Sequence, residues 1–191
     1  MSDAVETIEH KGHTIEIFHD ECDWSPREND NMCIFHIAHR NYAFGEHQWM
    51  SRQEVDDAQR EAEAIGDICV PLYMYDHSGI TISLTPFTCP FDSGQVGFVQ
   101  IKKDEIISNF GKKNWTKNLR IKALEVAAME VKELDSYLTG EVYGYIIDRD
   151  GLEQEGSCWG FIGDIKYCID EAKGEVDAII QHSQRVKTSA L

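Results

Sequence analysis

The chain has 191 residues, of which 42% are hydrophobic, and 34 Asp and Glu against 18 Lys and Arg give a formal net charge of −16. This composition excludes an intrinsically disordered chain, and no apolar run approaches the roughly 18 residues of a membrane-spanning helix. The N-terminal sequence also lacks the basic and apolar regions of a secretory signal, so we expect a cytoplasmic protein. Residues 1–191 should form a single domain with short polar tails and no membrane contact.

The first half of the chain contains two strand patterns and one helix pattern. Apolar and polar residues alternate over 13–18, and a more continuous apolar run covers 32–38, so both segments are predicted strands. Ser51 and Glu54 form a capping box, and Gly66 is a natural stop, which predicts a helix between them. Five acidic residues form its predicted outer face: Glu54, Asp56, Asp57, Glu61 and Glu63.

The middle of the chain predicts a β-hairpin followed by a third strand. Residues 72–76 and 79–84 flank the sequence D-H-S-G, whose composition is typical of a tight turn. Pro71 indicates an edge position or a bulge in the first of these strands. The third strand is expected over residues 95–101, after a second polar turn at 89–94.

Helical patterns and one more hairpin fill the rest of the chain. A short helix is predicted from Asp104, a longer one over 115–138 that ends at Gly140, and a last one over 164–186. Between the last two predicted helices, two predicted strands flank the sequence RDGLEQEG and form a second hairpin. Two hairpins without a repeated βαβ unit predict an α+β fold: a largely antiparallel sheet with about three to four helices packed on it.

The two polar turns between strands could carry chemistry. Asp76, His77 and Ser78 lie in the first turn, and Cys89, Asp92 and Ser93 lie in the second. A Cys89 nucleophile would need a base such as His77 within hydrogen-bond reach. Such side chains also bond backbone amides within turns, which is the role that we favour, with a binding surface as an alternative. We expect His77 and Asp92 to lie near each other.

Two other segments resemble metal-binding sequences only in part. The acidic loop 19–31 lacks the spacing of an EF-hand. His36 and His39 would share a face only in a helix, whereas the pattern there favours a strand. No phosphate-binding loop is present, so we expect neither a metal nor a cofactor.

Basic residues gather around Trp115, within residues 102–122. They could form a nucleic-acid patch, but a solvated helix face is the interpretation that we favour. Direct binding of nucleic acid is therefore not expected. The seven residues are Lys102, Lys103, Lys112, Lys113, Lys117, Arg120 and Lys122.

Several blocks resemble a family of uncharacterised proteins carried by bacteriophages and other bacterial mobile elements. They are SPRENDN, YDHSG, CPFDSGQVGF, YLTGEVYGY and SCWGF, and HRNYAFGEH resembles the family's HRRYNLGDEH. The family usually has SPREWDN and CPWDSGQVG, so Asn29 and Phe91 each replace a tryptophan. The resemblance implies a binding role for residues in or beside these blocks: Trp24, Arg27, Asp30, Asn31, Asp76, His77, Ser78, Asp92, Ser93, Gln95 and Trp159.

This context, together with a net charge of −11 in residues 1–70, favours an accessory protein that binds a basic surface of a host protein. Such proteins include inhibitors of restriction or CRISPR systems. The alternatives are a metal-dependent hydrolase acting on nucleic acid or a nucleotide, and an interaction module without inhibitory role. The hydrolase requires the two polar turns to converge with Trp24 or Trp159 in a concave site. The identity of the partner and the oligomeric state stay open.

Overall fold

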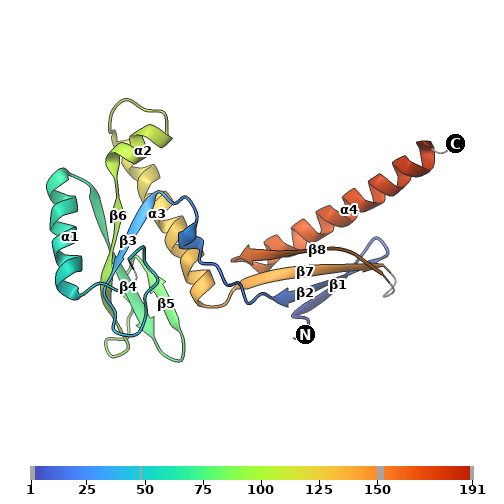
Figure 1. Ribbon diagram of the computed structural model, residues 1–191, viewed down its shortest axis with the longest axis horizontal. Helices are drawn as coiled ribbons and strands as arrows, with labels where there is room; N and C mark the ends of the chain where they lie inside the picture. The colour runs from blue at the N-terminus through green and yellow to red at the C-terminus, as the bar shows by residue number, and fades with distance from the viewer. Residues whose placement is uncertain (1–2, 48, 150–152, 190–191) are drawn as a thin grey trace. The chain divides into compact units, whose positions relative to one another are not determined.

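The computed structural model describes residues 3–47, 49–149 and 153–189 (Figure 1). The chain divides into two compact units. Unit 1 comprises Met1–Asp23 and Gly140–Leu191, and unit 2 comprises Trp24–Thr139. Unit 2 is therefore an insertion within the chain of unit 1.

Unit 1 is a four-stranded antiparallel sheet with one helix on one face (Figure 1). The strands lie in the order β1-β2-β7-β8. The β1–β2 hairpin and the β7–β8 hairpin are therefore joined by the pairing of β2 with β7. Alternate residues of the central strands face the helix, where Ile15, Ile17, Tyr145 and Ile147 form the core with Val176. The elements are β1 (Glu6–His10), β2 (His13–His19), β7 (Val142–Arg149), β8 (Glu153–Ile162) and α4 (Ile165–Ser189).

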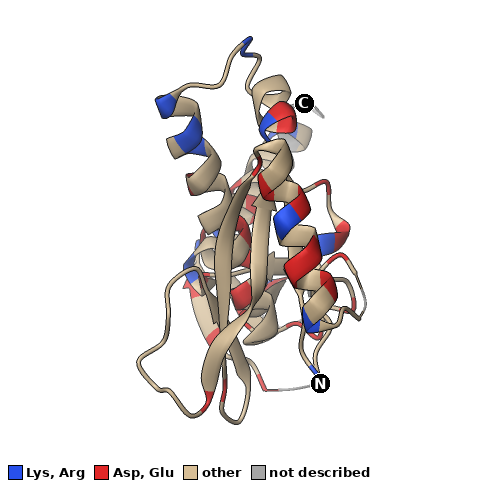
Figure 2. Ribbon diagram, turned by 90° about the vertical axis from the view of Figure 1, so that its left-hand side faces the viewer, with Lys and Arg blue, Asp and Glu red and all other residues tan. Residues whose placement is uncertain are grey.

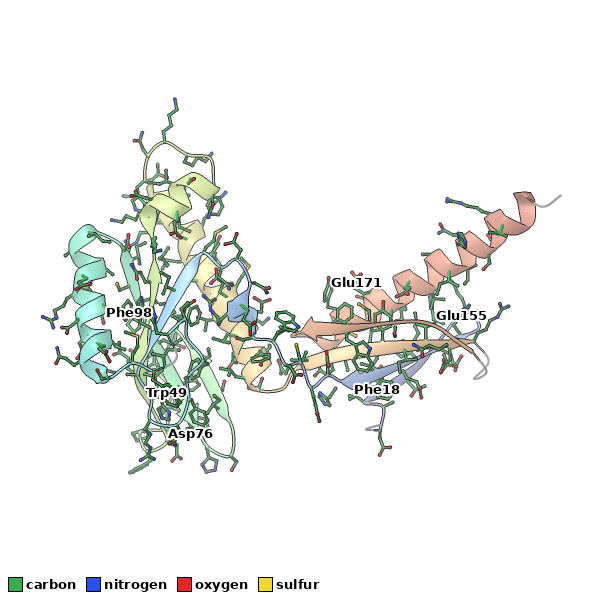
Figure 3. All side chains as sticks on the ribbon, in the orientation of Figure 1. Phe18, Trp49, Asp76, Phe98, Glu155 and Glu171 are labelled. Atoms are coloured by element: carbon green, nitrogen blue, oxygen red, sulfur yellow. The ribbon has the colours of Figure 1, made fainter. Side chains whose placement is uncertain are left out.

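Unit 2 has a helix on each face of a second four-stranded antiparallel sheet, with strand order β3-β6-β4-β5 (Figure 1). Helix α3 covers one face, where Phe35, Leu72 and Val99 lie in the main core. Helix α1 covers the other face, on which Phe98 is fully buried (Figure 3). The elements are η1 (Pro26–Glu28), β3 (Cys33–Ile37), α1 (Arg52–Ile65), β4 (Ile68–Asp76), β5 (Ile80–Ser83), β6 (Ser93–Ile101), α2 (Lys103–Asn109) and α3 (Lys117–Leu138).

Local signals in the sequence account for several of these elements. The capping box of Ser51 and Glu54 begins α1, and Gly66 ends it with a left-handed φ of 87°. The predicted hairpin is confirmed by the pairing of Asp76 with Ile80. Of the two alternatives that Pro71 indicated, the edge position is wrong because β4 lies between β6 and β5, and a register shift lies close by, between Leu72 and Tyr73.

The α+β class and the antiparallel pairing are confirmed, but the strands are shared between two sheets instead of forming one. Strand β1 was not predicted, although it begins the first sheet. The expected single domain stays a prediction. Within the described residues, no helix is long and apolar enough to cross a membrane.

The six cysteines form no disulfide, and all of them lie in the described part of the chain. Burial raises the pKa of Cys33 to about 12 and the pKa of Cys69 and Cys168 to about 11. These three thiols therefore stay protonated at neutral pH and act as packing groups.

Candidate functional site

The turn between β4 and β5 is held by its backbone. Ser78 adopts a left-handed φ of 59°, and the His77 N–H donates to the Gly79 carbonyl at 3.0 Å. The Asp76 N–H donates to the carbonyl of Asp92 at 2.8 Å. This last bond joins the β4–β5 turn to the turn before β6.

The second turn brings a thiol, a carboxylate and an imidazole together. The Ser93 hydroxyl donates to the Cys89 carbonyl and closes the turn. The Cys89 thiol donates to Asp92 Oδ2 at 3.7 Å, and His77 Nδ1 lies 3.4 Å from the same oxygen. The prediction that His77 and Asp92 lie near each other is therefore confirmed.

A third segment, residues 38–42 after β3, completes the site. The Tyr42 hydroxyl donates to Asp76 Oδ1 at 3.4 Å, and the Tyr42 ring stacks on His39 with 5.1 Å between centroids. The Asn41 N–H donates to His39 Nδ1 at 3.3 Å, so the neutral ring carries its proton on Nε2. The Ala38 N–H bonds the Val96 carbonyl at 2.9 Å and ties the segment to β6.

These three segments border a polar cleft of about 390 Å³, which we call the turn cleft. Its walls carry the carboxylates of Asp76 and Asp92 and the guanidinium of Arg40. Phe91 also lines it, although the Phe91 side chain is 92% exposed. Figure 3 shows Asp76 at the end of unit 2 where the β4–β5 turn lies. A cleft with two carboxylates and one cation suits a ligand with a basic group more than an anion.

The contacts in the turn cleft do not form a cysteine–histidine pair. The carboxylate of Asp92 is contacted by both the Cys89 thiol and the His77 ring, so His77 Nδ1 is directed at Asp92. Among the described residues, no group of three or more His, Cys, Asp or Glu side chains could hold a metal ion. His36 lies in β3, buried, with Nε2 bonded to Gln100 Oε1 at 2.8 Å. The turn cleft is therefore better suited to binding than to nucleophilic catalysis.

Predicted binding residues of the first block are engaged inside unit 2. The Arg27 side chain is 6% exposed, forms ion pairs with Glu46 and with Glu130 at 2.8 Å, and stacks over Phe35. The Asn31 amide donates to the Pro26 and Asn29 carbonyls at 3.0 and 2.9 Å. Their contacts stabilise the fold. Asp30 is exposed and Trp24 is 40% exposed, and neither lines the turn cleft.

Trp159 belongs to unit 1, on the face of its sheet opposite α4. The ring lies over Gly144, where an added Cβ would approach it to 2.0 Å, and 6.2 Å from the Phe18 ring. With 47% of its surface exposed, Trp159 forms an aromatic platform in unit 1. The blocks of the sequence resemblance are thus distributed over both units.

The predicted acidic residues lie on α1, where Figure 2 shows Asp and Glu along the helix. The Arg52 guanidinium donates to the carbonyl of Gln95, a lining residue, at 3.1 Å. Arg52 also pairs with Asp56 at 3.4 Å, and Arg60 pairs with Asp57. Bonds from the Ser51 N–H and hydroxyl lower the pKa of Glu54. Five carboxylates and two arginines leave α1 with a charge of −3.

The acidic residues of the segment 1–70 are divided between the two units. Unit 1 combines both ends of the chain and carries 17 acidic and 6 basic residues, a net charge of −11. Unit 2 carries 17 acidic and 12 basic residues, a net charge of −5. The greater charge density therefore belongs to unit 1.

Sequence reasoning did not assign His39, Arg40, Tyr42 and Phe91 to the site. The first three lie in the HRNYAFGEH segment, whose density of polar and aromatic residues after a strand was the available signal. No signal along the chain places this segment beside the two turns, because the contact depends on β3 pairing with β6.

No protein-family model matches the chain, and no curated protein and no solved structure matches it either. The similarity of its motif blocks to the phage and mobile-element family therefore stays a prediction, and function is inferred from the site itself.

Proposed function

We propose that the protein is an acidic accessory protein of a bacteriophage or mobile element that binds a basic surface of a host protein, as anti-restriction or anti-CRISPR inhibitors do. The observation that carries the proposal is Phe91, 92% exposed at a cleft whose walls hold Asp76 and Asp92. An exposed aromatic ring beside carboxylates is typical of an anchor that enters a pocket rimmed by cations.

Helix α1 extends this surface beyond the turn cleft. Its contact through Arg52 and Gln95 joins the carboxylates of the helix to the edge of the cleft. Attraction between exposed charges is screened within about 8 Å at physiological salt, so the affinity should fall as salt rises. Most of this loss belongs to the association rate, because long-range attraction acts on the encounter.

One observation favours the alternative of a metal-dependent hydrolase. The His77 ring and the Cys89 thiol both contact the Asp92 carboxylate, and Asp76 lines the same cleft as Asp92. However, the described residues offer no group of three metal ligands, and neither Trp24 nor Trp159 is among the lining residues. The binding function therefore has the stronger support.

The test begins with affinity purification of host proteins on the full chain at low and high salt. The retained partner is then purified, and its binding kinetics are measured against a variant with Asp56, Asp57, Glu61 and Glu63 changed to Lys. We expect association to slow by about tenfold or more. The matched control changes Glu6, Glu21, Asp170 and Glu171 of unit 1 to Lys, which alters the net charge equally and should slow association less.

Phe91→Ser tests the anchor separately. Loss of the ring should accelerate dissociation by about tenfold with little change in melting temperature, because the side chain is 92% exposed. The proposal fails if no partner is retained at low salt, or if the α1 and Phe91 variants bind as the wild type does. Hydrolysis of a nucleotide on addition of a divalent metal, abolished by Asp76→Ala, would support the hydrolase instead.

A further inference from the structure

A second pocket of unit 2 lies where the loop after α2 meets the start of α3. Its volume is about 450 Å³, and Phe110 and Leu119 supply apolar surface to it. Lys112, Lys113 and Lys122 also line it and are exposed. The pocket therefore combines an apolar floor with a cationic rim.

The aromatic rings here are held by the core and contacted by cations. Phe110 and Trp115 are partly buried and pack against the core of unit 2, which fixes their positions. Lys122 Nζ lies 5.5 Å from the Phe110 ring centroid, and Lys103 Nζ lies 5.9 Å from the Trp115 centroid. Rigid rings beside ammonium groups provide a surface for stacking and for charge attraction together.

The positive charge of this region is not neutralised locally. Residues 102–122 carry seven Lys and Arg and only two acidic residues, a net charge of +5 within a unit of net charge −5. Figure 2 shows Lys and Arg at this end of unit 2. The ion pairs among the described residues include Lys102 with Glu105 at 2.9 Å and none of Lys112, Lys113 or Lys122. These cations are available to an anionic ligand.

We propose that this region binds single-stranded nucleic acid, with one base on the apolar floor formed by Phe110 and Leu119 and its phosphates on Lys112, Lys113 and Lys122. A phosphate chain uses the cations, and an unpaired base uses the apolar surface between them. An acidic protein surface would use the cations alone. A base within a duplex is stacked and paired, so it could not enter the pocket.

The inference departs from the sequence expectation of a solvated lysine face and of no direct contact with nucleic acid. The net charge of −16 repels a polyanion at long range, whereas the patch acts at contact distance. Binding should therefore be weak and strongly dependent on salt, with a logarithmic slope of about −0.7 for each phosphate contacted. This region lies apart from the turn cleft in its lining residues, so the inference does not rest on the proposed function.

The test is fluorescence anisotropy of the full chain with a labelled oligothymidine of about twelve nucleotides, a length within the usual range of single-strand sites. We expect binding at low salt that weakens by about tenfold or more in the double variant Lys113→Glu, Lys122→Glu. The matched control is Lys132→Glu with Lys166→Glu, which changes the charge equally at exposed sites outside the patch. The α1 charge-reversal variant should bind the oligonucleotide at least as well as the wild type.

Phe110→Leu tests the stacking contact, with an expected loss of about fivefold or more. Circular dichroism of each variant identifies any unfolded protein, and the lysine variants decide the question if Phe110→Leu does not fold. The inference is overturned by absence of binding at low salt, by an equal loss in the control, or by equal affinity for duplex DNA. It is also overturned if ATP binds as tightly as the oligonucleotide, or if the lysine variant alters the sedimentation of the protein alone, which would indicate contact with a second copy.

Discussion

At the scale of single residues, Arg27 joins segments of unit 2 that are far apart in the sequence. Its guanidinium bonds Glu46 before α1, Glu130 in α3 and the carbonyl of Cys33 in β3. Glu130 in turn accepts the Met32 N–H at 2.8 Å. The side chain of Arg27 is 6% exposed and that of Glu130 11% exposed, so water screens this pair little.

Arg27→Ala should lower the free energy of unfolding by about 3–5 kcal/mol, because it leaves two carboxylates without their cation in a largely buried position. Chemical denaturation followed by circular dichroism measures the loss. Arg120→Ala is the matched control, since Arg120 is exposed on α3, and its effect should stay within about 0.5 kcal/mol. Equal losses in the two variants would contradict a structural role for Arg27.

At the scale of elements, β6 depends on a close approach of backbones. β6 pairs with both β3 and β4, and Gly97 stands opposite Ile37 and Leu72 in these ladders. An added Cβ at Gly97 would lie 1.8 Å from the carbonyl oxygen of His36, which is backbone and cannot turn aside. The glycine is required by this space.

Gly97→Ala should destabilise unit 2 by about 1–3 kcal/mol or more, since the strands must move apart to admit the methyl group. Thermal melting measures the change. The control is Gly94→Ala in the same strand, where an added Cβ would meet nothing within 4 Å. A melting temperature that falls equally in both variants would mean that loss of glycine flexibility, not crowding, is the cause.

The β1–β2 hairpin of unit 1 is joined to α4 through Asp177. Lys11 Nζ donates to both carboxylate oxygens, at 2.7 and 2.8 Å, and His10 Nε2 lies 2.9 Å from Oδ1. The bond from Lys11 and then that from His10 lower the pKa of Asp177 below 3.8. A carboxyl with a lowered pKa stabilises the fold above its unfolded pKa, and this contribution is lost as the pH falls through the folded value.

Asp177→Asn should therefore lower the melting temperature at about pH 6, and its difference from the wild type should shrink as the pH falls below 3.8. Melting curves across this range measure the effect. Asp170→Asn, at an exposed position of the same helix, should show no such convergence. If the difference in melting temperature between Asp177→Asn and the wild type did not change with pH, the ionised Asp177 carboxylate would not be its cause.

At the scale of the whole molecule, the two units have separate cores. Ile15, Ile17 and Ile147 belong to the core of unit 1, whereas Phe35 and Leu72 belong to that of unit 2. Unit 2 is continuous in the chain, and its two links to unit 1 adjoin β2 and β7, which pair with each other. Each unit thus contains the contacts that a folded domain requires.

Residues 24–139 expressed alone should therefore fold, with a helical and strand circular-dichroism spectrum and a cooperative melting transition. Gly97→Ala in this fragment should lower its melting temperature as in the full chain, which serves as the internal control. A fragment without a cooperative transition would show that unit 2 depends on unit 1 for its stability.

The limits of α1 and the β4–β5 hairpin followed from the sequence, because capping boxes, glycine stops and turn residues act over three or four neighbouring positions. The α+β class followed from the hairpins and the helix patterns. At the site, sequence placed the turns of His77 and Asp92 side by side, because the strands that they flank are adjacent along the chain.

Only the tertiary structure decided which strands share a sheet. The backbone of a strand can form hydrogen bonds with many other strands, and its hydrophobic pattern does not specify which of them is the partner. β2 pairs with β7 across more than a hundred residues and thereby separates unit 1 from unit 2. Within unit 2, the pairing of β3 with β6 brings His39 to the turn cleft, and the ion pair with Glu130 of α3 holds Arg27 in a buried position. The local sequence is the same whether a charged side chain is exposed to solvent or pairs with a buried carboxylate. Only the packing of the folded chain distinguishes these two environments.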